Sequence, residues 1–189
     1  MAETEVLMAG FGGQGMLLAG KILAHAAMTE GLEVSWLPSY GPEMRGGTAN
    51  VTVCISKRPI GSPLITNPRG LLVMNLPSLE KFAPKVRPGG VIVINASLVN
   101  RGSERDDVVE IKVAAREMAA EAGTHRAANF VMLGAYVGAT GVVPEETIES
   151  EIAEEFSGSK EKFVPANVAA LRAGLEAVRK VAGQVRSSA

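Results

Sequence analysis

Cysteine is nearly absent from this chain of 189 residues, which contains Cys54 alone. A single thiol cannot form a disulfide within the chain, and it cannot supply the four thiolates that an iron–sulfur cluster generally requires. Cys54 lies in the apolar run VTVCIS, so we interpret it as a small buried residue rather than a reactive thiol. The two histidines, His25 and His125, lie in different segments and form no zinc-binding pattern. With no G-x-S-x-G motif either, we predict no metal site and no catalytic residue in this chain.

A strong net charge and long apolar runs are also missing. The formal net charge is −1, which argues against a general attraction to nucleic acid or to an anionic membrane surface. The apolar runs are far shorter than the roughly 20 residues that span a bilayer. The opening residues MAETEVLMAG are acidic rather than basic, unlike a secretory signal. We therefore expect a cytoplasmic protein without a membrane span.

The composition that remains is that of one globular domain. Hydrophobic residues make up 47% of the chain and charged residues 21%, and we predict a single domain over residues 1–189. A chain of this size buries roughly 70% of its unfolded surface, so it needs no disulfide to fold. Aromatic residues are scarce at 4%, so the core must be filled by small and aliphatic side chains that allow close packing.

Hydrophobic patterning predicts strands alternating with helices. A buried strand at 6–9, a helix at 16–29 and a strand at 33–37 are typical of a parallel, right-handed β-α-β unit. Proline and glycine predict loops at 38–47 and 57–70. Further strands are predicted at 48–56, 71–74, 91–95 and 108–113, and further helices at 114–122, 129–140, 145–156 and 166–185. The predicted fold is an α/β, Rossmann-like three-layer sandwich with a mostly parallel central sheet and a helical C-terminal part.

The predicted helix at 145–156 is strongly acidic on one side. Ile148, Ile152 and Phe156 follow the helical repeat and form an apolar face. We interpret the acidic side chains that cover the remainder as a solvated face rather than a binding site. They are Glu146, Glu149, Glu151, Glu154 and Glu155.

A glycine-rich loop connects the first strand to the first helix. Gly10, Gly12 and Gly15 match the spacing G-x-G-x-x-G, which lets a phosphate approach the free N–H groups of a helix. A dinucleotide site also needs an acid near the end of the second strand, and EVSWLPS has none at that end. The loop therefore forms a tight turn with close backbone packing, or serves another phosphate-bearing or interfacial role. A stand-alone nucleotide-binding protein is the alternative reading.

A second loop, PSYGPEMRGG, follows the second strand. Arg45 is flanked by two glycines, and its guanidinium can hold a carboxylate or a phosphate through paired hydrogen bonds. Glu43 could instead pair with Arg45 inside the loop, and Tyr40 suits either an interface, an adenine stack or a core-capping position. Both loops follow strands, so we expect them to meet at one edge of the sheet.

The candidate ligand-binding or interface residues come from these loops and from one later helix. They are Gly12, Gly13, Gln14, Gly15, Ser39, Tyr40, Glu43, Arg45, Gly46, Gly47 and Asn129. Asn129 stands at a predicted helix start, where it is most simply an N-cap, and it could also face the same cleft.

Together these segments resemble a known family. The motifs GFGGQG and SYGPEMRGG, followed by Ser56, PI at 59–60, SP at 62–63, NFVMLG at 129–134 and the segment 167–174, resemble the gamma subunit of 2-oxoacid:ferredoxin (acceptor) oxidoreductases. The resemblance covers nearly the whole chain. Two departures stand out: Arg69 follows Pro68 where the family commonly has aspartate, and the loop lacks the histidine-glycine-methionine version of indolepyruvate-type subunits. We therefore favour 2-oxoglutarate or a branched-chain 2-oxoacid, rather than indolepyruvate, as the substrate that the resemblance implies.

The resemblance implies a complex that oxidatively decarboxylates a 2-oxoacid to an acyl-CoA and reduces ferredoxin. Thiamine diphosphate and magnesium would lie on alpha and beta subunits, and iron–sulfur clusters on a ferredoxin-like delta subunit or other domains. This chain would bind no cofactor alone and would be inactive alone. Its implied role is structural, shaping the approach of coenzyme A or substrate, and in isolation we expect a homodimer through the exposed partner surface.

Overall fold

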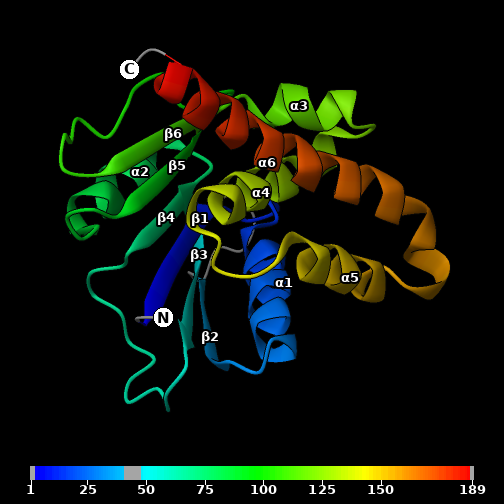
Figure 1. Cartoon of the computed structure of the whole chain (residues 1–189), viewed down its shortest axis with the longest axis horizontal. Helices are drawn as coiled ribbons and strands as arrows, with labels where there is room; N and C mark the ends of the chain where they lie inside the picture. Colours follow the sequence, from blue (N-terminus) through cyan, green and yellow to red (C-terminus); the bar gives the residue numbers. More distant parts are fainter. Residues whose placement is uncertain (1–2, 41–47, 188–189) are drawn as a thin grey trace.

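The computed structural model describes residues 3–40 and 48–187, with the side chains of Tyr40 and 180–187 left aside. Within these residues, six strands form one sheet in the order β2-β3-β1-β4-β5-β6 (Figure 1). The strands are β1 (Thr4–Phe11), β2 (Glu33–Tyr40), β3 (Thr48–Ser56), β4 (Gly70–Val73), β5 (Val91–Asn95) and β6 (Val109–Val113).

The direction of the strands departs from the prediction at one point. β4, β5 and β6 continue parallel from β1, but β3 is antiparallel to both β1 and β2. β1 and β2 therefore run the same way without being neighbours, and the predicted parallel β-α-β pair is split by β3. The reason is the short connection between β2 and β3. Only seven residues separate Tyr40 from Thr48, whereas a parallel crossover needs a dozen or more.

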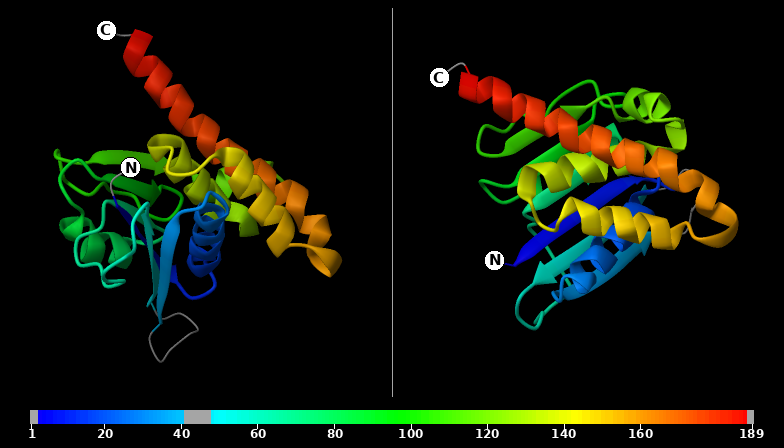
Figure 2. Two further views of the ribbon diagram at one scale, coloured as in Figure 1. Left: turned by 60° about the horizontal axis from the view of Figure 1, so that its bottom comes forward. Right: turned by 45° about the vertical axis from the view of Figure 1, so that its right-hand side comes forward.

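Helices cover both faces of this mostly parallel sheet, as the predicted three-layer sandwich requires (Figures 1 and 2). Alternate residues of β1 point to opposite faces. Val6 and Met8 join a large core with α1 (Met16–Thr29) and α4 (Ala128–Thr140). Leu7 and Ala9 join a smaller core with α2 (Leu76–Phe82) and the 3-10 turn η1 (Ala83–Lys85). The remaining helical elements are α3 (Ala115–Glu121), η2 (His125–Ala127), α5 (Glu145–Glu155), η3 (Gly158–Phe163) and α6 (Val164–Ser187).

Most predicted elements lie within two residues of the observed ones, and β2 is the main exception. It continues through Pro38 to Tyr40, into the segment predicted as a loop. Proline lacks the N–H that a central strand would need, but β2 is the edge strand of the sheet and tolerates it. Cys54 is fully buried in β3, as predicted, and burial raises the pKa of its thiol. No described helix combines the length and the hydropathy required to cross a bilayer.

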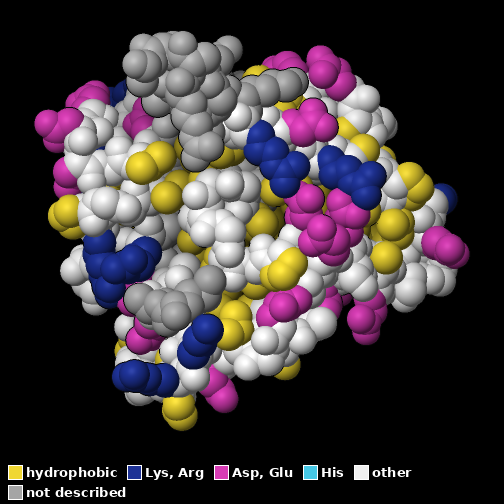
Figure 3. Space-filling model, viewed as in Figure 1, with side chains coloured by type: hydrophobic (Ala, Val, Ile, Leu, Met, Phe, Trp, Pro, Cys, Tyr) yellow, Lys and Arg dark blue, Asp and Glu magenta, His cyan; other side chains and the backbone are white. Residues whose placement is uncertain are grey.

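The acidic side of α5 is not simply solvated. Figure 3 shows basic and acidic side chains gathered where α5 and α6 lie together, and Arg172 there pairs with Glu149 at 2.6 Å. On the other side of α5, Glu151 is buried and accepts a hydrogen bond from the hydroxyl of Thr29 at 2.7 Å. The prediction of a solvated face was wrong for Glu151, because α1 packs against it. Exposed ion pairs of this kind contribute little individually, and α5 is held mainly by Ile148 and Ile152, which are buried in the large core.

The helices α4 and α6 pack closely against each other at two glycines. A Cβ atom at Gly134 would lie 2.0 Å from the carbonyl oxygen of Leu171. One at Gly174 would lie 2.1 Å from the carbonyl oxygen of Val131. Both distances are impossible for real atoms, so the two backbones approach as closely as they do only because both positions are glycine. α6, which lies across the outside of α4 (Figure 2), depends on this contact.

We expect Gly134→Ala to destabilise the protein by about 3 kcal/mol, because the added methyl group forces α4 and α6 apart. Gly138→Ala is the matched control in the same helix. Its Cβ would meet Leu175 at 3.4 Å, an ordinary contact, so its free energy of unfolding should stay within about 1 kcal/mol of the parent. Urea denaturation followed by circular dichroism measures both. Equal effects of the two substitutions would contradict the close-packing interpretation.

Candidate functional site

The glycine loop is a compact turn between β1 and α1. The N–H of Gln14 donates to the carbonyl oxygen of Phe11 at 3.1 Å. The side-chain oxygen of Gln14 accepts from the N–H of Phe11 at 2.6 Å and from the amide of Asn75 at 3.4 Å. Gly13 and Gly15 adopt positive φ angles of 94° and 76°, which glycine alone adopts without strain. The polar side chain that sets this loop apart from ordinary fingerprints therefore holds the turn closed.

Asn129 braces the loop from behind. It is 2% exposed, and its side-chain amide donates to the carbonyl oxygen of Gly15 at 3.1 Å. The other side-chain atom, Oδ1, is buried and has no hydrogen-bond partner among the described residues. A Cβ at Gly15 would lie 2.8 Å from the Asn129 amide nitrogen, so the contact requires glycine.

The prediction that Asn129 caps a helix was wrong. The helix α4 begins at Ala128, and the cap position is held by Ala127. The turn η2 leads directly into α4, so the capping side chain lies earlier, where the hydroxyl of Thr124 accepts from the N–H of Arg126 at 3.3 Å. Asn129 is thereby placed inside the helix, where its side chain is available to the glycine loop.

A cavity of about 290 Å³ opens in front of this loop. It lies beyond the carboxyl ends of β1, β4 and β5, the position at which open α/β sheets commonly bind ligands. Its lining residues are Gly13, Gln14, Met74, Asn95, Leu98, Arg116, His125, Arg126 and Ala128. We call it the basic cavity, since its charged lining consists of cationic or protonatable side chains.

Positive charge gathers around the basic cavity. Neither the Arg116 nor the Arg126 guanidinium lies within ion-pair distance of a carboxylate in the described part of the chain. The neighbouring acid is Glu117, whose hydrogen bond to the Ser97 hydroxyl, aided by Arg116 and His125, lowers the pKa of its carboxyl. The amino end of α1 adds its partial positive charge, and no side chain caps it. The arrangement suits a phosphate or another anion.

The second loop starts from the same edge of the sheet. Ala49 of β3 pairs with Gly10 on one side and with Tyr40 on the other. The end of β1 and the end of β2 are thus separated by a single strand, or about 10 Å. Ser39 is exposed on β2 and pairs with Asn50. Of the other residues predicted on this loop, Glu43, Arg45, Gly46 and Gly47 lie outside the described residues.

Sequence reasoning found the glycine loop but missed most of the basic cavity. Gly13 and Gln14 line it, Asn129 is hydrogen-bonded to Gly15 behind it, and Gly12 belongs to the same turn without lining the cavity. His125 was interpreted as a solvated turn residue; it is exposed, and it also lines the cavity. Arg116 and Arg126 were not singled out, because they belong to segments remote from the glycine motif. One residue in the sequence could have indicated this cavity: Asn95 is a polar residue at the carboxyl end of the buried strand VIVIN.

Comparison with known proteins identifies the family of this chain. Residues 5–177 match the family model described as pyruvate ferredoxin/flavodoxin oxidoreductase. The chain belongs to this family. The 2-oxoglutarate synthase subunit KorC of Methanocaldococcus jannaschii is 34% identical over 181 residues, which cover 94% of this chain and 95% of KorC. The gamma subunit of a keto/oxoacid ferredoxin oxidoreductase from Geobacter sulfurreducens has the same fold, with a TM-score of 0.81 and 31% identity, over 94% of this chain and 99% of that one.

The similarity is higher to part of a longer relative. The ketoisovalerate oxidoreductase subunit VorA of Methanothermobacter marburgensis is 44% identical over 180 residues, covering 94% of this chain. The match spans 37% of the length of VorA. The resemblance to gamma-type subunits read from the sequence is confirmed, and the fold it implied is confirmed with it.

We expect Gly15→Ala to destabilise the protein by about 3 kcal/mol, since it adds a clash with Asn129 to the strain of a positive φ. Gly13→Ala is the matched control. It carries the same φ strain, but its Cβ would meet nothing within 4 Å, so its cost should be about 1–2 kcal/mol.

A double-mutant cycle isolates the contact. In an Asn129→Ala background the excess cost of Gly15→Ala over Gly13→Ala should shrink, because the side chain that clashes has been removed. Thermal or urea unfolding measures all members of the cycle. Strict additivity of Gly15→Ala and Asn129→Ala would contradict the bracing role of Asn129.

Proposed function

We propose that this chain acts as a gamma-type component of a 2-oxoacid:ferredoxin oxidoreductase that converts a 2-oxoacid to an acyl-CoA. The family match supports this, and so does the end-to-end similarity to KorC and to the Geobacter sulfurreducens gamma subunit. In this proposal the chain assembles with alpha, beta and ferredoxin-like delta subunits, and the complex passes electrons to ferredoxin. We place the complex in the cytoplasm and expect the chain to be inactive alone.

The basic cavity is the observation that carries a specific role. Two guanidinium groups, a histidine and the amino end of α1 converge on a space of about 290 Å³, enough for one phosphate-bearing end of a larger molecule. Coenzyme A carries phosphates at one end and its reactive thiol at the other. We propose that Arg116 and Arg126 hold the phosphate end, so that the thiol extends toward the neighbouring subunits. Catalysis would then depend on this chain for positioning rather than for chemistry.

The remaining cofactors of the proposed complex belong on other chains. Cys54 is buried in β3 and has no second cysteine to join it. Within the described residues, no group of three or more histidine, cysteine, aspartate or glutamate side chains is arranged to hold a metal ion. As the family resemblance implies, we propose that thiamine diphosphate, magnesium and iron–sulfur clusters are held by the partner subunits.

The second loop extends this proposal to the substrate side. Arg45 remains our candidate for contact with a carboxylate, a phosphate or a partner chain, together with its sequence neighbours Ser39, Tyr40, Glu43, Gly46 and Gly47. The end of β2, from which this segment continues, is separated from the end of β1 by one strand. We continue to favour 2-oxoglutarate or a branched-chain 2-oxoacid as substrate, since the names of KorC and VorA refer to 2-oxoglutarate and ketoisovalerate.

Assembly provides the first test. Co-expression with alpha, beta and delta subunits from the same genome should give a stable complex with 2-oxoacid- and coenzyme A-dependent ferredoxin reduction, whereas the chain alone should show none. Affinity purification through a tag on this chain, followed by mass measurement, reads out the assembly. Failure to associate, combined with tight binding of NAD, FAD or a nucleotide by the isolated chain, would favour the stand-alone nucleotide-binding alternative.

The phosphate-holding role predicts a specific kinetic defect. In the assembled complex, the double substitution Arg116→Gln and Arg126→Gln should raise the KM for coenzyme A by about tenfold or more, because charge-assisted hydrogen bonds are lost. The KM for the 2-oxoacid should not change.

Arg101→Gln serves as the control for that substitution. Its guanidinium pairs with Glu80 outside the basic cavity, and its loss should leave both constants unaltered. In the same assay, Arg45→Ala shows which ligand the second loop contacts, by raising either the KM for coenzyme A or the KM for the 2-oxoacid. If the double substitution leaves the KM for coenzyme A at the parent value, the basic cavity is not the phosphate site.

A further inference from the structure

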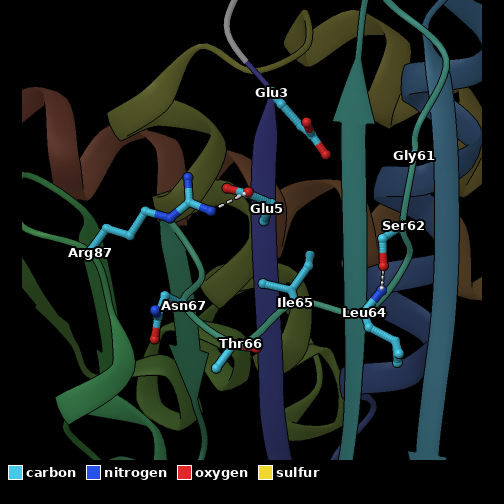
Figure 4. Close-up of a pocket in the computed structure, with 9 residues that line it drawn as sticks. All are labelled: Glu3, Glu5, Gly61, Ser62, Leu64, Ile65, Thr66, Asn67 and Arg87. Atoms are coloured by element: carbon cyan, nitrogen blue, oxygen red, sulfur yellow. Dashed lines mark hydrogen bonds and ion pairs between the residues drawn. The ribbon is translucent and has the colours of Figure 1, made fainter.

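A second cavity lies at the opposite end of β1 from the glycine loop. It has a volume of about 520 Å³ and is formed by the first residues of β1, the loop between β3 and β4, and Arg87 after η1. Figure 4 shows its lining residues, which are Glu3, Glu5, Gly61, Ser62, Leu64, Ile65, Thr66, Asn67 and Arg87. We call it the acidic pocket. It has no part in the proposed handling of coenzyme A.

A buried carboxylate in this pocket is only half satisfied. The side chain of Glu5 is 7% exposed, and its Oε1 accepts a hydrogen bond from the Nη2 of Arg87 at 2.6 Å (Figure 4). Its Oε2 is buried and has no hydrogen-bond partner among the described residues. A buried carboxylate oxygen without a donor is costly, so a binding partner that supplies a donor to Oε2 would be stabilised there.

The charges of the pocket specify what that partner must be. The carboxylates of Glu3 and Glu5 and the guanidinium of Arg87 line the pocket, and Arg87 is paired with Glu5, so the lining residues carry a formal charge of −1. An anion would add to this excess, whereas a cation with N–H groups would neutralise it and supply the donor that Oε2 lacks. The last torsion of a glutamate is soft, so a small rotation can present Oε2 to such a donor.

The rest of the lining is suited to an aliphatic stem. Leu64, which is 76% exposed, and Ile65 lie on the loop that forms one wall (Figure 4). A large apolar side chain so exposed covers little of the protein itself and is free to pack against the methylene groups of a ligand. A bare metal ion would leave this wall unused, and no group of three or more histidine, cysteine, aspartate or glutamate side chains among the described residues is arranged to hold one.

We propose that the acidic pocket binds an alkyl-guanidinium or alkyl-ammonium group. The cationic head donates hydrogen bonds to Glu5 Oε2 and to the Glu3 carboxylate, and the stem packs on Leu64. Such a group can come from an arginine or lysine side chain of another polypeptide, or from a free organic cation. Both sources share the same head and stem. The site is independent of the proposed enzymatic role, because it is defined by residues of this chain alone.

Calorimetric titration of the full chain with n-butylguanidinium tests the proposal. We expect saturable binding at one site, and no binding of n-butylurea, which has the same shape without the charge. Glu5→Gln keeps the size of the side chain but removes its charge, and it should weaken binding by about tenfold or more. Glu3→Gln, at an exposed position, should weaken it severalfold. Glu80→Gln, an exposed acid outside the pocket, is the matched control and should have no effect.

Three results would overturn the proposal: no saturable binding of n-butylguanidinium, equal binding of n-butylurea, or binding that neither Glu3→Gln nor Glu5→Gln weakens. Thermal stabilisation by Mg²⁺ or Ca²⁺ in place of the organic cation would overturn it as well. The source is then identified in the purified complex. Loss of the n-butylguanidinium site upon assembly assigns the pocket to a partner's basic side chain, and retention of the site assigns it to a free cation. Failure of the complex to form leaves the titration of the isolated chain unaffected.

Discussion

The lack of a side chain at Gly15 is the constraint on which the candidate site depends. It allows Asn129 of α4 to reach the carbonyl of Gly15, and this contact joins the first βα turn to a helix more than a hundred residues later in the chain. α4 is in turn fixed against α6 through Gly134 and Gly174. A chain of glycine-permitted contacts therefore runs from the turn that faces the basic cavity to the C-terminal helix. The scarcity of aromatic residues is consistent with this mode of packing, because backbones approach closely only where side chains are small.

β1 organises both sites because its two ends face different surroundings. Its carboxyl end leads into the glycine loop and the basic cavity, where cationic side chains from α3 and η2 gather. Its amino end carries Glu3 and Glu5 into the acidic pocket. The strand itself is buried on both faces between two cores. This buried strand therefore holds a cavity lined by cationic side chains and a pocket lined by two carboxylates at a fixed separation.

The sequence predicted the elements of this fold well because most of them are locally determined. The strand at 48–56 and the helix at 16–29 were bounded by β-branched runs, glycines and prolines that act within a few residues. The position of β3 between β1 and β2 was missed, because pairing order depends on contacts between distant segments. The role of Asn129 was missed for the same reason. Its local position resembled a cap, whereas its partner lies 114 residues earlier. Arg116 and Arg126 carry no local signal either, and only the topology brings them to the glycine loop.

The insertion of β3 also explains why a G-x-G-x-x-G turn need not mean a dinucleotide. In the usual dinucleotide fold the second strand lies directly beside the first, and an acid at its end reaches the ribose of a nucleotide held on the glycine loop. Here the neighbour of β1 on that side is the start of β3, where Ala49 pairs with Gly10, and β2 is displaced outward by one strand. An acid at the end of β2 would stand about 10 Å from β1, twice the usual strand spacing. The turn keeps the uncapped amino end of α1, a position that suits an anion, while the adjacent position that would select a ribose is occupied by an antiparallel strand.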